Sequence, residues 1–356
     1  MLARTPEQNL RYPLLLVHGL FSSSRTWKKT VQVFQQDYDL RYGGEVSQKG
    51  FAADTAGAAD FYTWNFSDSR NLSYRQQASE LAEGIAHILE KNKAEKVVIA
   101  GHSMGGLAAR ALVQLLGFDK VYALITLGTP HYGSPLALLR ESTQGGAQKM
   151  LSKLHRALAR SESQGDSRPG FFRRILLRLF AATTEAEAEV DRFFSSEAFI
   201  ELAPGSKALE ELNRAPVPAD IRYVFLTGSV TDFAPFRDAA TIATYKKVRK
   251  LWLRMTEGAV GSLTRRYLEE PYGVFRKYLL DYQPAAATLS REQLTDFDGA
   301  VPVMSQILNH FATPPVLKAV LPVFASHTRL TKRPAKLFQA LAIAGVVGNS
   351  GAQRSP

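Results

Sequence analysis

A serine enclosed by glycines is the feature of this chain with the clearest chemical potential. Residues 101–105 read GHSMG and match the pattern G-x-S-x-G, after the apolar run 97–100 and before the helix-forming run 107–116. In that context the pattern is typical of a strained strand-to-helix turn that exposes a serine hydroxyl as a nucleophile. Glycines on both sides remove the Cβ atoms that would clash there. We therefore predict Ser103 as a nucleophile, on a turn made by Gly101, His102 and Gly105.

A serine hydroxyl needs a base, and the base needs an acid to orient it. On turns of this kind the acid and then the histidine follow the serine along the chain. The histidines after the serine are His131, His155, His310 and His327. We prefer His327 because it directly follows the last strand-like run and precedes the closing helical pattern. His310 is the alternative base.

Three aspartates are candidates for the acid. Asp298 begins an Asp-Gly turn between the strand-like run 221–226 and the predicted base. Asp232 lies nearer to the end of that run and is the main alternative, and Asp296 ranks third. Aspartates beside glycine or threonine also serve as turn or cap residues, so the residue types alone leave this choice open.

The reaction of a serine with a carbonyl also needs two backbone donors for the developing oxyanion. One is expected to be the amide of Met104, directly after the serine. The other is expected in the loop HGLFSSS, which follows the first strand-like run. Within that loop we choose the amide of Leu20, with Phe21 as the alternative.

Strand-like and helical patterns alternate along the chain and must position these residues. The strand-like runs are 13–17, 61–66, 97–100, 121–127, 221–226 and 320–325, and the helical patterns are 78–89, 107–116 and 336–346. This alternation predicts an α/β fold with a mostly parallel central sheet flanked by helices. We expect a single domain over 1–356, with largely helical cap or lid insertions at 134–218 and 231–295 and a loose tail at 348–356.

Composition narrows the functional classes. The 356 residues are 45% hydrophobic and 22% charged, which is typical of a globular protein. The absence of cysteine excludes disulfides, thiolate metal sites and a cysteine nucleophile. The formal net charge of +11 favours anionic partners. With neither a signal-peptide pattern nor a membrane-length apolar run, the expected location is cytoplasmic or peripheral to a membrane.

The two predicted insertions contain basic amphipathic patterns, at 171–180 and 245–255. Such helices fit a cap packed on the core, and they also fit a surface that contacts an anionic membrane. In both cases an apolar lid would lie above Ser103, which suits an acyl chain. Because no nucleic-acid motif accompanies the basic residues, nucleic acid is not expected as a partner. The oligomeric state is not predicted.

Five segments in order, LLLVHGLF, GHSMGGLAAR, LGTPHYGSP, DGAVP and SHT, resemble the bacterial lipase and esterase branch of the α/β-hydrolase superfamily. That branch includes relatives of the triacylglycerol lipases and of glycosylphosphatidylinositol deacylases. The resemblance implies the α/β-hydrolase fold, a triad of Ser103, Asp298 and His327, and an oxyanion hole in the HGL loop. It favours Asp298 over Asp232. The basic segment after His327 lacks the aspartate of a calcium site, so neither a metal nor another cofactor is expected.

The combined prediction is a serine carboxylic-ester hydrolase, a lipase or esterase, that cleaves esters with an apolar acyl chain through an acyl-enzyme intermediate. One alternative is a membrane-associated phospholipase or another lipid acyl hydrolase. A non-enzymatic alternative is a protein of the same fold that binds a lipid or a protein partner.

Overall fold

The computed structural model describes residues 9–53, 57–135, 137, 196–229, 273–288, 296, 298 and 300–348. Most of the predicted insertions 134–218 and 231–295 lies outside these ranges. The amphipathic patterns at 171–180 and 245–255 lie wholly outside them. Of the predicted tail 348–356, only the first residue is described.

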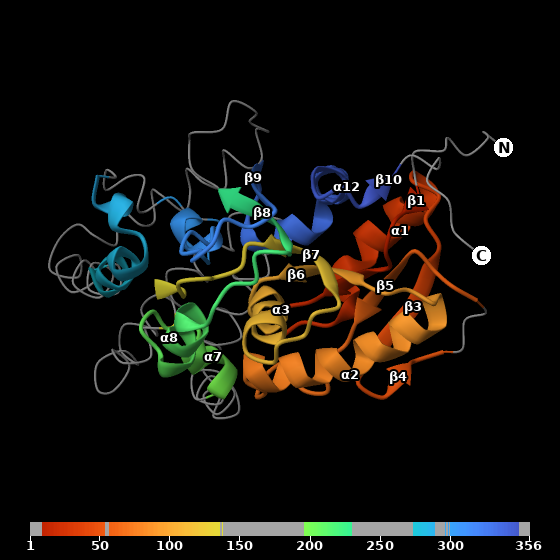
Figure 1. Ribbon diagram of the computed structural model, residues 1–356, viewed down its shortest axis with the longest axis horizontal. Coiled ribbons are helices and arrows are strands. Elements are labelled where there is room, and N and C mark those ends of the chain that lie inside the picture. The colour runs from red at the N-terminus through yellow and green to blue at the C-terminus, as the bar shows by residue number, and fades with distance from the viewer. Residues whose placement is uncertain are drawn as a thin grey trace, which may run out of the picture.

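A sheet of eight strands forms the centre of the molecule, in the order β4-β3-β5-β2-β6-β7-β8-β9 (Figure 1). The strands are β2 (Leu14–Val17), β3 (Tyr42–Ser47), β4 (Gly50–Phe51), β5 (Phe61–Trp64), β6 (Val97–His102), β7 (Val121–Leu127), β8 (Arg222–Ser229) and β9 (Leu317–Phe324). Every pair is parallel except β3 with β4. Strands β1 (Asn9–Leu10) and β10 (Val347–Gly348) form a separate antiparallel pair. The predicted α/β class with a mostly parallel sheet is therefore confirmed.

Helices cover both faces of the sheet (Figure 1). The α-helices are α1 (Lys28–Gln36), α2 (Tyr74–Asn92), α3 (Met104–Gln114), α7 (Glu197–Glu201), α8 (Lys207–Arg214) and α12 (Pro334–Ile343), and residues 273–282 are also helical. The 3-10 helices are η2 (Ser24–Trp27), η4 (Pro284–Thr288), η5 (Val303–Gln306) and η6 (His327–Lys332). Helices α2 and α3 pack together, and α1 packs on α12.

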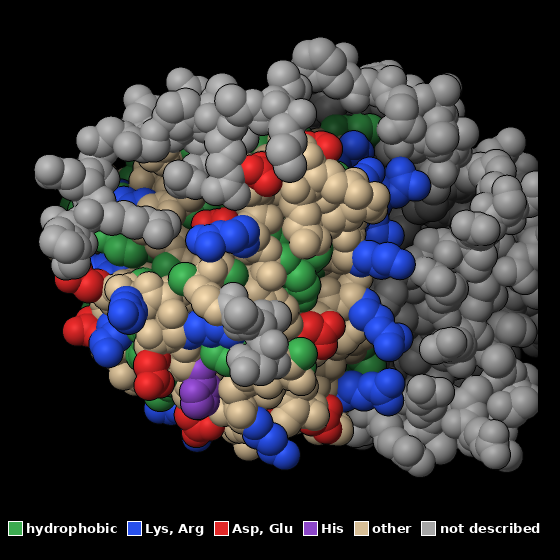
Figure 2. Space-filling view, turned by 90° about the vertical axis from the view of Figure 1, so that its right-hand side faces the viewer, with side chains coloured by type: hydrophobic (Ala, Val, Ile, Leu, Met, Phe, Trp, Pro, Cys, Tyr) green, Lys and Arg blue, Asp and Glu red, His purple; other side chains and the backbone are tan. Residues whose placement is uncertain are grey.

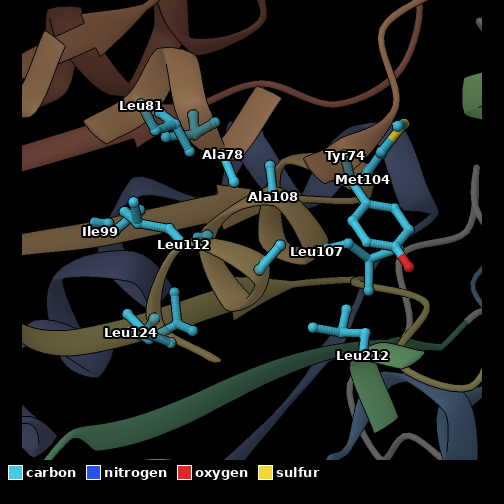
Figure 3. Close-up of a cluster of buried hydrophobic side chains, with 14 of the residues drawn as sticks. Tyr74, Ala78, Leu81, Ile99, Met104, Leu107, Ala108, Leu112, Leu124 and Leu212 are labelled. Atoms are coloured by element: carbon cyan, nitrogen blue, oxygen red, sulfur yellow. The ribbon is translucent and has the colours of Figure 1, made fainter. Parts of the chain in front are cut away.

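The alternation of strand side chains explains why the core has two halves. On β2, Leu15 and Val17 belong to the cluster that contains α2 and α3, while Leu14 and Leu16 belong to the cluster that contains α1 and α12. Successive strand residues point to opposite faces, and both faces are covered by helices. A continuous apolar run such as 14–17 is the result. Figure 3 shows part of the first cluster, with Leu81 of α2, Ile99 of β6, Leu112 of α3 and Leu124 of β7 among the labelled side chains.

The structure changes several predicted boundaries and adds elements. The strand predicted at 61–66 ends at Trp64, and the helix predicted at 107–116 already begins at Met104. Strand β3 and helix α1 were not predicted. The sequence of β3, YGGEVS, has neither an apolar run nor strict alternation. Helix α1 begins with two lysines and has no side-chain cap, so the usual start signals are missing.

Helix α2, by contrast, carries strong end signals. The Ser73 side chain accepts from the amide of Gln76, whose own side chain accepts from the Ser73 amide. This capping box satisfies two amides that lack partners within the helix. The helix ends at Asn92, and the cap residue Lys93 that follows has a left-handed φ of 50°. In the described part of the chain, no helix has both the length and the apolar character of a membrane span.

Gly84 allows α2 to pack tightly on the sheet. A Cβ atom at Gly84 would lie 2.1 Å from the Trp64 ring and 2.9 Å from the Ser47 carbonyl oxygen. In an open helix, glycine to alanine stabilises by up to about 1 kcal/mol. For Gly84→Ala we expect the opposite, a loss of about 1–3 kcal/mol from overpacking, measured by chemical denaturation. The control is Gly273→Ala, where a Cβ atom would have no neighbour within 4 Å among the residues that the structure describes. Equal effects of the two changes would contradict the packing argument.

Candidate active site

Ser103 lies on a strained turn between β6 and α3. Its backbone angles are φ 55° and ψ −129°, a conformation that is rare for a residue with a side chain. Strand β6 ends at His102 and α3 begins at Met104, so the whole change of direction occurs at the serine. Strain of this kind persists only where the surrounding structure holds it.

Glycines leave the space that this turn requires. A Cβ atom at Gly101 would lie 2.7 Å from the Cα atom of Gly106, and one at Gly105 would lie 2.3 Å from the carbonyl oxygen of His18. At Gly106 it would lie 2.0 Å from Oγ1 of Thr129, beyond the end of β7. The three glycines therefore let the start of α3 approach β6, the loop after β2 and the loop after β7.

Asp298 and His327 form a buried pair. Nδ1 of His327 lies 2.7 Å from Oδ2 of Asp298, and the backbone amide of His327 donates to the carbonyl oxygen of Asp298 over 2.8 Å. The other carboxylate oxygen of Asp298 accepts from the amides of Ala300 (2.9 Å) and Val301 (2.8 Å). Asp298 is fully buried. The carboxylate and the imidazole are thus fixed in register by both main-chain and side-chain bonds.

Two further glycines make room for this pair, and the sequence reasoning missed both. Gly128 follows β7 with a φ of 61°, and a Cβ atom there would lie 3.0 Å from both Oδ2 of Asp298 and Nδ1 of His327. At Gly228, in β8, a Cβ atom would lie 2.9 Å from Cβ of Asp298. The signal in the sequence is a glycine near the end of each apolar run, in TLGT and FLTG.

His102 connects the serine turn to His327. Its Nε2 lies 2.9 Å from the carbonyl oxygen of His327 and donates to it. Burial, and then the neighbouring His327, lower the pKa of His102 to about 3. The ring is therefore neutral, with its proton on Nε2, and Nδ1 has no hydrogen-bond partner among the described residues. The sequence reasoning placed His102 in the turn without foreseeing this contact.

The loop after β2 lies directly against Ser103. A Cβ atom at Gly19 would lie 2.7 Å from Cβ and 3.3 Å from Oγ of Ser103. Nδ1 of His18 donates to the carbonyl oxygen of Gly19 (3.0 Å), and its Nε2 accepts from the amide of Phe66 (3.4 Å). Burial lowers the pKa of His18 to about 4, so this ring is neutral as well. His18 thereby fixes the loop over the serine.

The candidate oxyanion donors differ in their availability. The amide of Phe21 donates to the carbonyl oxygen of Ser69 over 3.2 Å, so it is already occupied. Within the described ranges, the amides of Leu20 and Met104 have no acceptor. Met104 is the first residue of α3, where amides lack partners inside the helix and the helix dipole is positive.

The alternative base and acids either have other partners or lie outside the described residues. His310 bonds to the Tyr132 hydroxyl over 2.7 Å, and burial lowers its pKa to about 3. Asp296 accepts from the Ser229 hydroxyl over 2.6 Å. Asp232 lies outside the described residues. The structure thus brings Asp298 together with His327, while the His310 side chain bonds to Tyr132 and the Asp296 side chain to Ser229.

The hydroxyl of Ser103 has no hydrogen bond to His327 in the described part of the molecule. The two residues are nevertheless close in the fold: the Ser103 amide donates to Leu127, the residue before Gly128, and the His102 and His327 rings lie 4.7 Å apart. Hydrogen bonds between nucleophile and base are often long without substrate and shorten when it binds. Among the described residues, no group of three or more metal-binding side chains gathers.

Comparison with known proteins finds relatives among lipases and deacylases. A model of the PGAP1-like alpha/beta domain family matches residues 10–177. The triacylglycerol lipase of Pseudarthrobacter phenanthrenivorans is 30% identical over 36% of this chain and 35% of its own length. The GPI inositol-deacylase of Debaryomyces hansenii is 27% identical over 35% of this chain and 13% of its own length. The matches thus span about a third or less of these relatives.

Two solved structures resemble this chain at low sequence identity. The mature lipase BlEst2 of Bacillus licheniformis has a TM-score of 0.47 and 15% identity, over 94% of this chain and 91% of that chain. EstA of Clostridium botulinum has a TM-score of 0.45 and 16% identity, over 99% and 90%. The sheet order, the serine turn and the sequence matches together place this chain in the α/β-hydrolase superfamily.

The contact between Gly19 and Ser103 can be tested directly. In Gly19→Ala the new methyl group would overlap Cβ of Ser103, so the loop and the serine must move apart. We expect the rate at which a fluorophosphonate labels Ser103 to fall by about 100-fold, as misplacements near 1 Å do. Gly273→Ala serves as the control and should label at the rate of the unmodified protein. Unchanged labelling of a folded Gly19→Ala protein would show that the loop tolerates the methyl group.

Proposed function

We propose that this protein is a serine hydrolase of carboxylic esters, a lipase or esterase that works through an acyl-enzyme intermediate. The observation that carries the proposal is the buried Asp298–His327 pair, linked by His102 to the strained turn that bears Ser103. An acid, a base and a serine in this arrangement are the parts that acyl transfer requires.

The proton positions follow from the contacts. Nδ1 of His327 donates to the Asp298 carboxylate, which leaves Nε2 unprotonated and able to accept the proton of Ser103. Asp298 stays an acceptor because two backbone amides also donate to it. As Ser103 attacks the ester carbonyl carbon, His327 takes its proton and becomes a cation that the carboxylate stabilises.

The remaining steps use the free amides. The amides of Leu20 and Met104 would donate to the oxyanion of the tetrahedral intermediate. His327 then gives its proton to the leaving alkoxide oxygen, the carbon–oxygen bond breaks, and the alcohol departs. Water attacks the acyl-enzyme with His327 again as the base, which releases the carboxylic acid and restores Ser103.

The substrate class is supported by the relatives. They are a triacylglycerol lipase and a GPI inositol-deacylase, and both names describe removal of an acyl group from a lipid. We propose an ester with an apolar acyl chain. The deacylase relatives support a second candidate, a membrane-associated phospholipase or other lipid acyl hydrolase with the same Ser103 chemistry. The predicted lids would contact the acyl chain and an anionic membrane.

The central test is a profile of hydrolysis against acyl chain length, measured with soluble chromogenic esters and with liposomes. We expect turnover to rise with chain length. Ser103→Ala should lower the rate by about three orders of magnitude or more, and it should abolish fluorophosphonate labelling. A folded protein that hydrolyses no ester of any length, or that retains activity without Ser103, would refute the proposal. Stoichiometric lipid binding without hydrolysis would instead support the non-enzymatic alternative.

The choice of acid can be tested separately. In Asp298→Asn, the NH2 group of the new side chain cannot accept from Nδ1 of His327, so the imidazole takes the wrong tautomer. We expect a fall in kcat of about four orders of magnitude, read from steady-state hydrolysis of a soluble ester. Asp296→Asn is the matched control because Asp296 bonds to Ser229 instead, and it should stay within about threefold of the unmodified enzyme. Similar losses in both variants would refute the assignment of Asp298.

A further inference from the structure

A group of exposed cations borders the carboxyl edge of the sheet, next to the candidate active site. The basic patch, as we call it, consists of Arg25, Lys28, Lys29, Arg329, Lys332 and Lys336, all of them exposed. They lie on η2, α1, η6 and α12. Helix α1 packs on η6 and α12, and η2 packs on η6. Two hydrogen bonds connect these elements, from Thr30 to the Thr331 carbonyl oxygen (2.7 Å) and between the Thr26 and Thr331 hydroxyls (3.4 Å).

Among the described residues, no carboxylate pairs with the cations of the patch. Neither 22–36 nor 326–348 contains an acidic residue. One carboxylate, Glu45, lies beneath η2, and its two oxygens accept from Ser24 and Asn65. By contrast, acidic and basic side chains mix over much of the face that Figure 2 shows.

Several of these cations lie where they reduce the stability of the fold. Lys28 and Lys29 are the first two residues of α1, and Lys336 is the third residue of α12. Neither helix has an acidic residue in its first turn or a side-chain cap. The positive end of a helix dipole repels a cation, and the cations also repel one another. Local choices that oppose stability are typical of functional surfaces.

From these observations we infer that the basic patch binds the anionic headgroups of a phospholipid bilayer. The patch continues directly from the site, because η6 begins at His327. A bilayer bound there lies beside Ser103 and supplies the lipid ester, so this inference names the lipid surface on which the proposed hydrolase acts. The residues of the basic patch differ from those of the predicted basic lids. Binding itself requires no catalysis.

A bilayer fits the patch better than nucleic acid does. Proteins that bind single strands stack bases on exposed aromatic rings, and the large exposed apolar side chains of the described residues include no aromatic ring. The adjacent chemistry also favours lipid, because a membrane contains carboxylic esters and a nucleic acid does not.

The test measures binding of the inactive Ser103→Ala protein to vesicles of phosphatidylcholine alone and of phosphatidylcholine with phosphatidylglycerol. We expect binding only to the anionic vesicles, weakening as salt is added. Adding Lys28→Glu and Lys332→Glu should weaken that binding by about 30-fold or more, since each basic residue near an anionic surface contributes about fivefold. The matched control adds Lys49→Glu and Lys120→Glu, two exposed lysines away from the patch with the same change of charge, and should bind within about threefold of the parent.

Several outcomes would overturn the inference. They are equal binding to both kinds of vesicle, equal losses in the patch variant and the control, and no loss in the patch variant. Tighter binding to duplex DNA than to vesicles, lost in the patch variant, would assign the patch to nucleic acid instead.

Thermal unfolding checks the fold, and Lys28→Glu should keep or raise the unfolding midpoint. If the glutamate variant does not fold, the glutamine variant of both lysines replaces it. Failure of ester hydrolysis would leave the binding result unaffected, so the two proposals fail separately.

Discussion

The close approach of backbones around Ser103 is the constraint on which the rest of the site depends. The main chains of β6, α3 and the loop after β2 are packed so closely that a single added methyl group would not fit. Glycine at 19, 101, 105 and 106 satisfies this constraint, and the left-handed φ of Ser103 is its consequence. Because β6, α3 and the loop after β2 meet there, the surrounding structure holds the strain at the serine.

The same principle extends to the base and the acid, where hydrogen bonds replace steric fit. His327 is held from three sides: its ring by the Asp298 carboxylate, its amide by the Asp298 carbonyl group, and its own carbonyl group by His102. Two buried histidines stay neutral beside the proposed triad, since burial keeps the pKa of His18 near 4 and that of His102 near 3. A charged ring at either position would oppose the cation that we propose forms on His327.

The sequence predicted the fold class because strands covered on both faces are largely apolar along their length, as β2, β6 and β7 are. It failed for β3, whose glycines and glutamate carry no periodic signal, and for α1, whose lysines conceal its start. Spacing and chain order singled out Ser103 and His327, since chemistry restricts both to the ends of strands. The positions of His102 and Gly128 beside His327 could not be foreseen, because the contacts join residues 225 and 199 apart in the chain and depend on how β6, β7 and β9 lie in the sheet.

The topology of the parallel sheet places both the candidate site and the positive charge at the carboxyl edge. In a parallel sheet every strand delivers its following loop to the same edge, and helices that cover the sheet begin there as well. Ser103, His327 and the loop after β2, which we propose as nucleophile, base and oxyanion loop, are therefore gathered by topology, and so are the amino ends of α1, α3 and α12. At α3 the positive helix end faces the serine, where negative charge would develop during acyl transfer. At α1 and α12 lysines add to that positive potential. An anionic surface that approaches this edge is consequently attracted to the side of the molecule on which Ser103 lies.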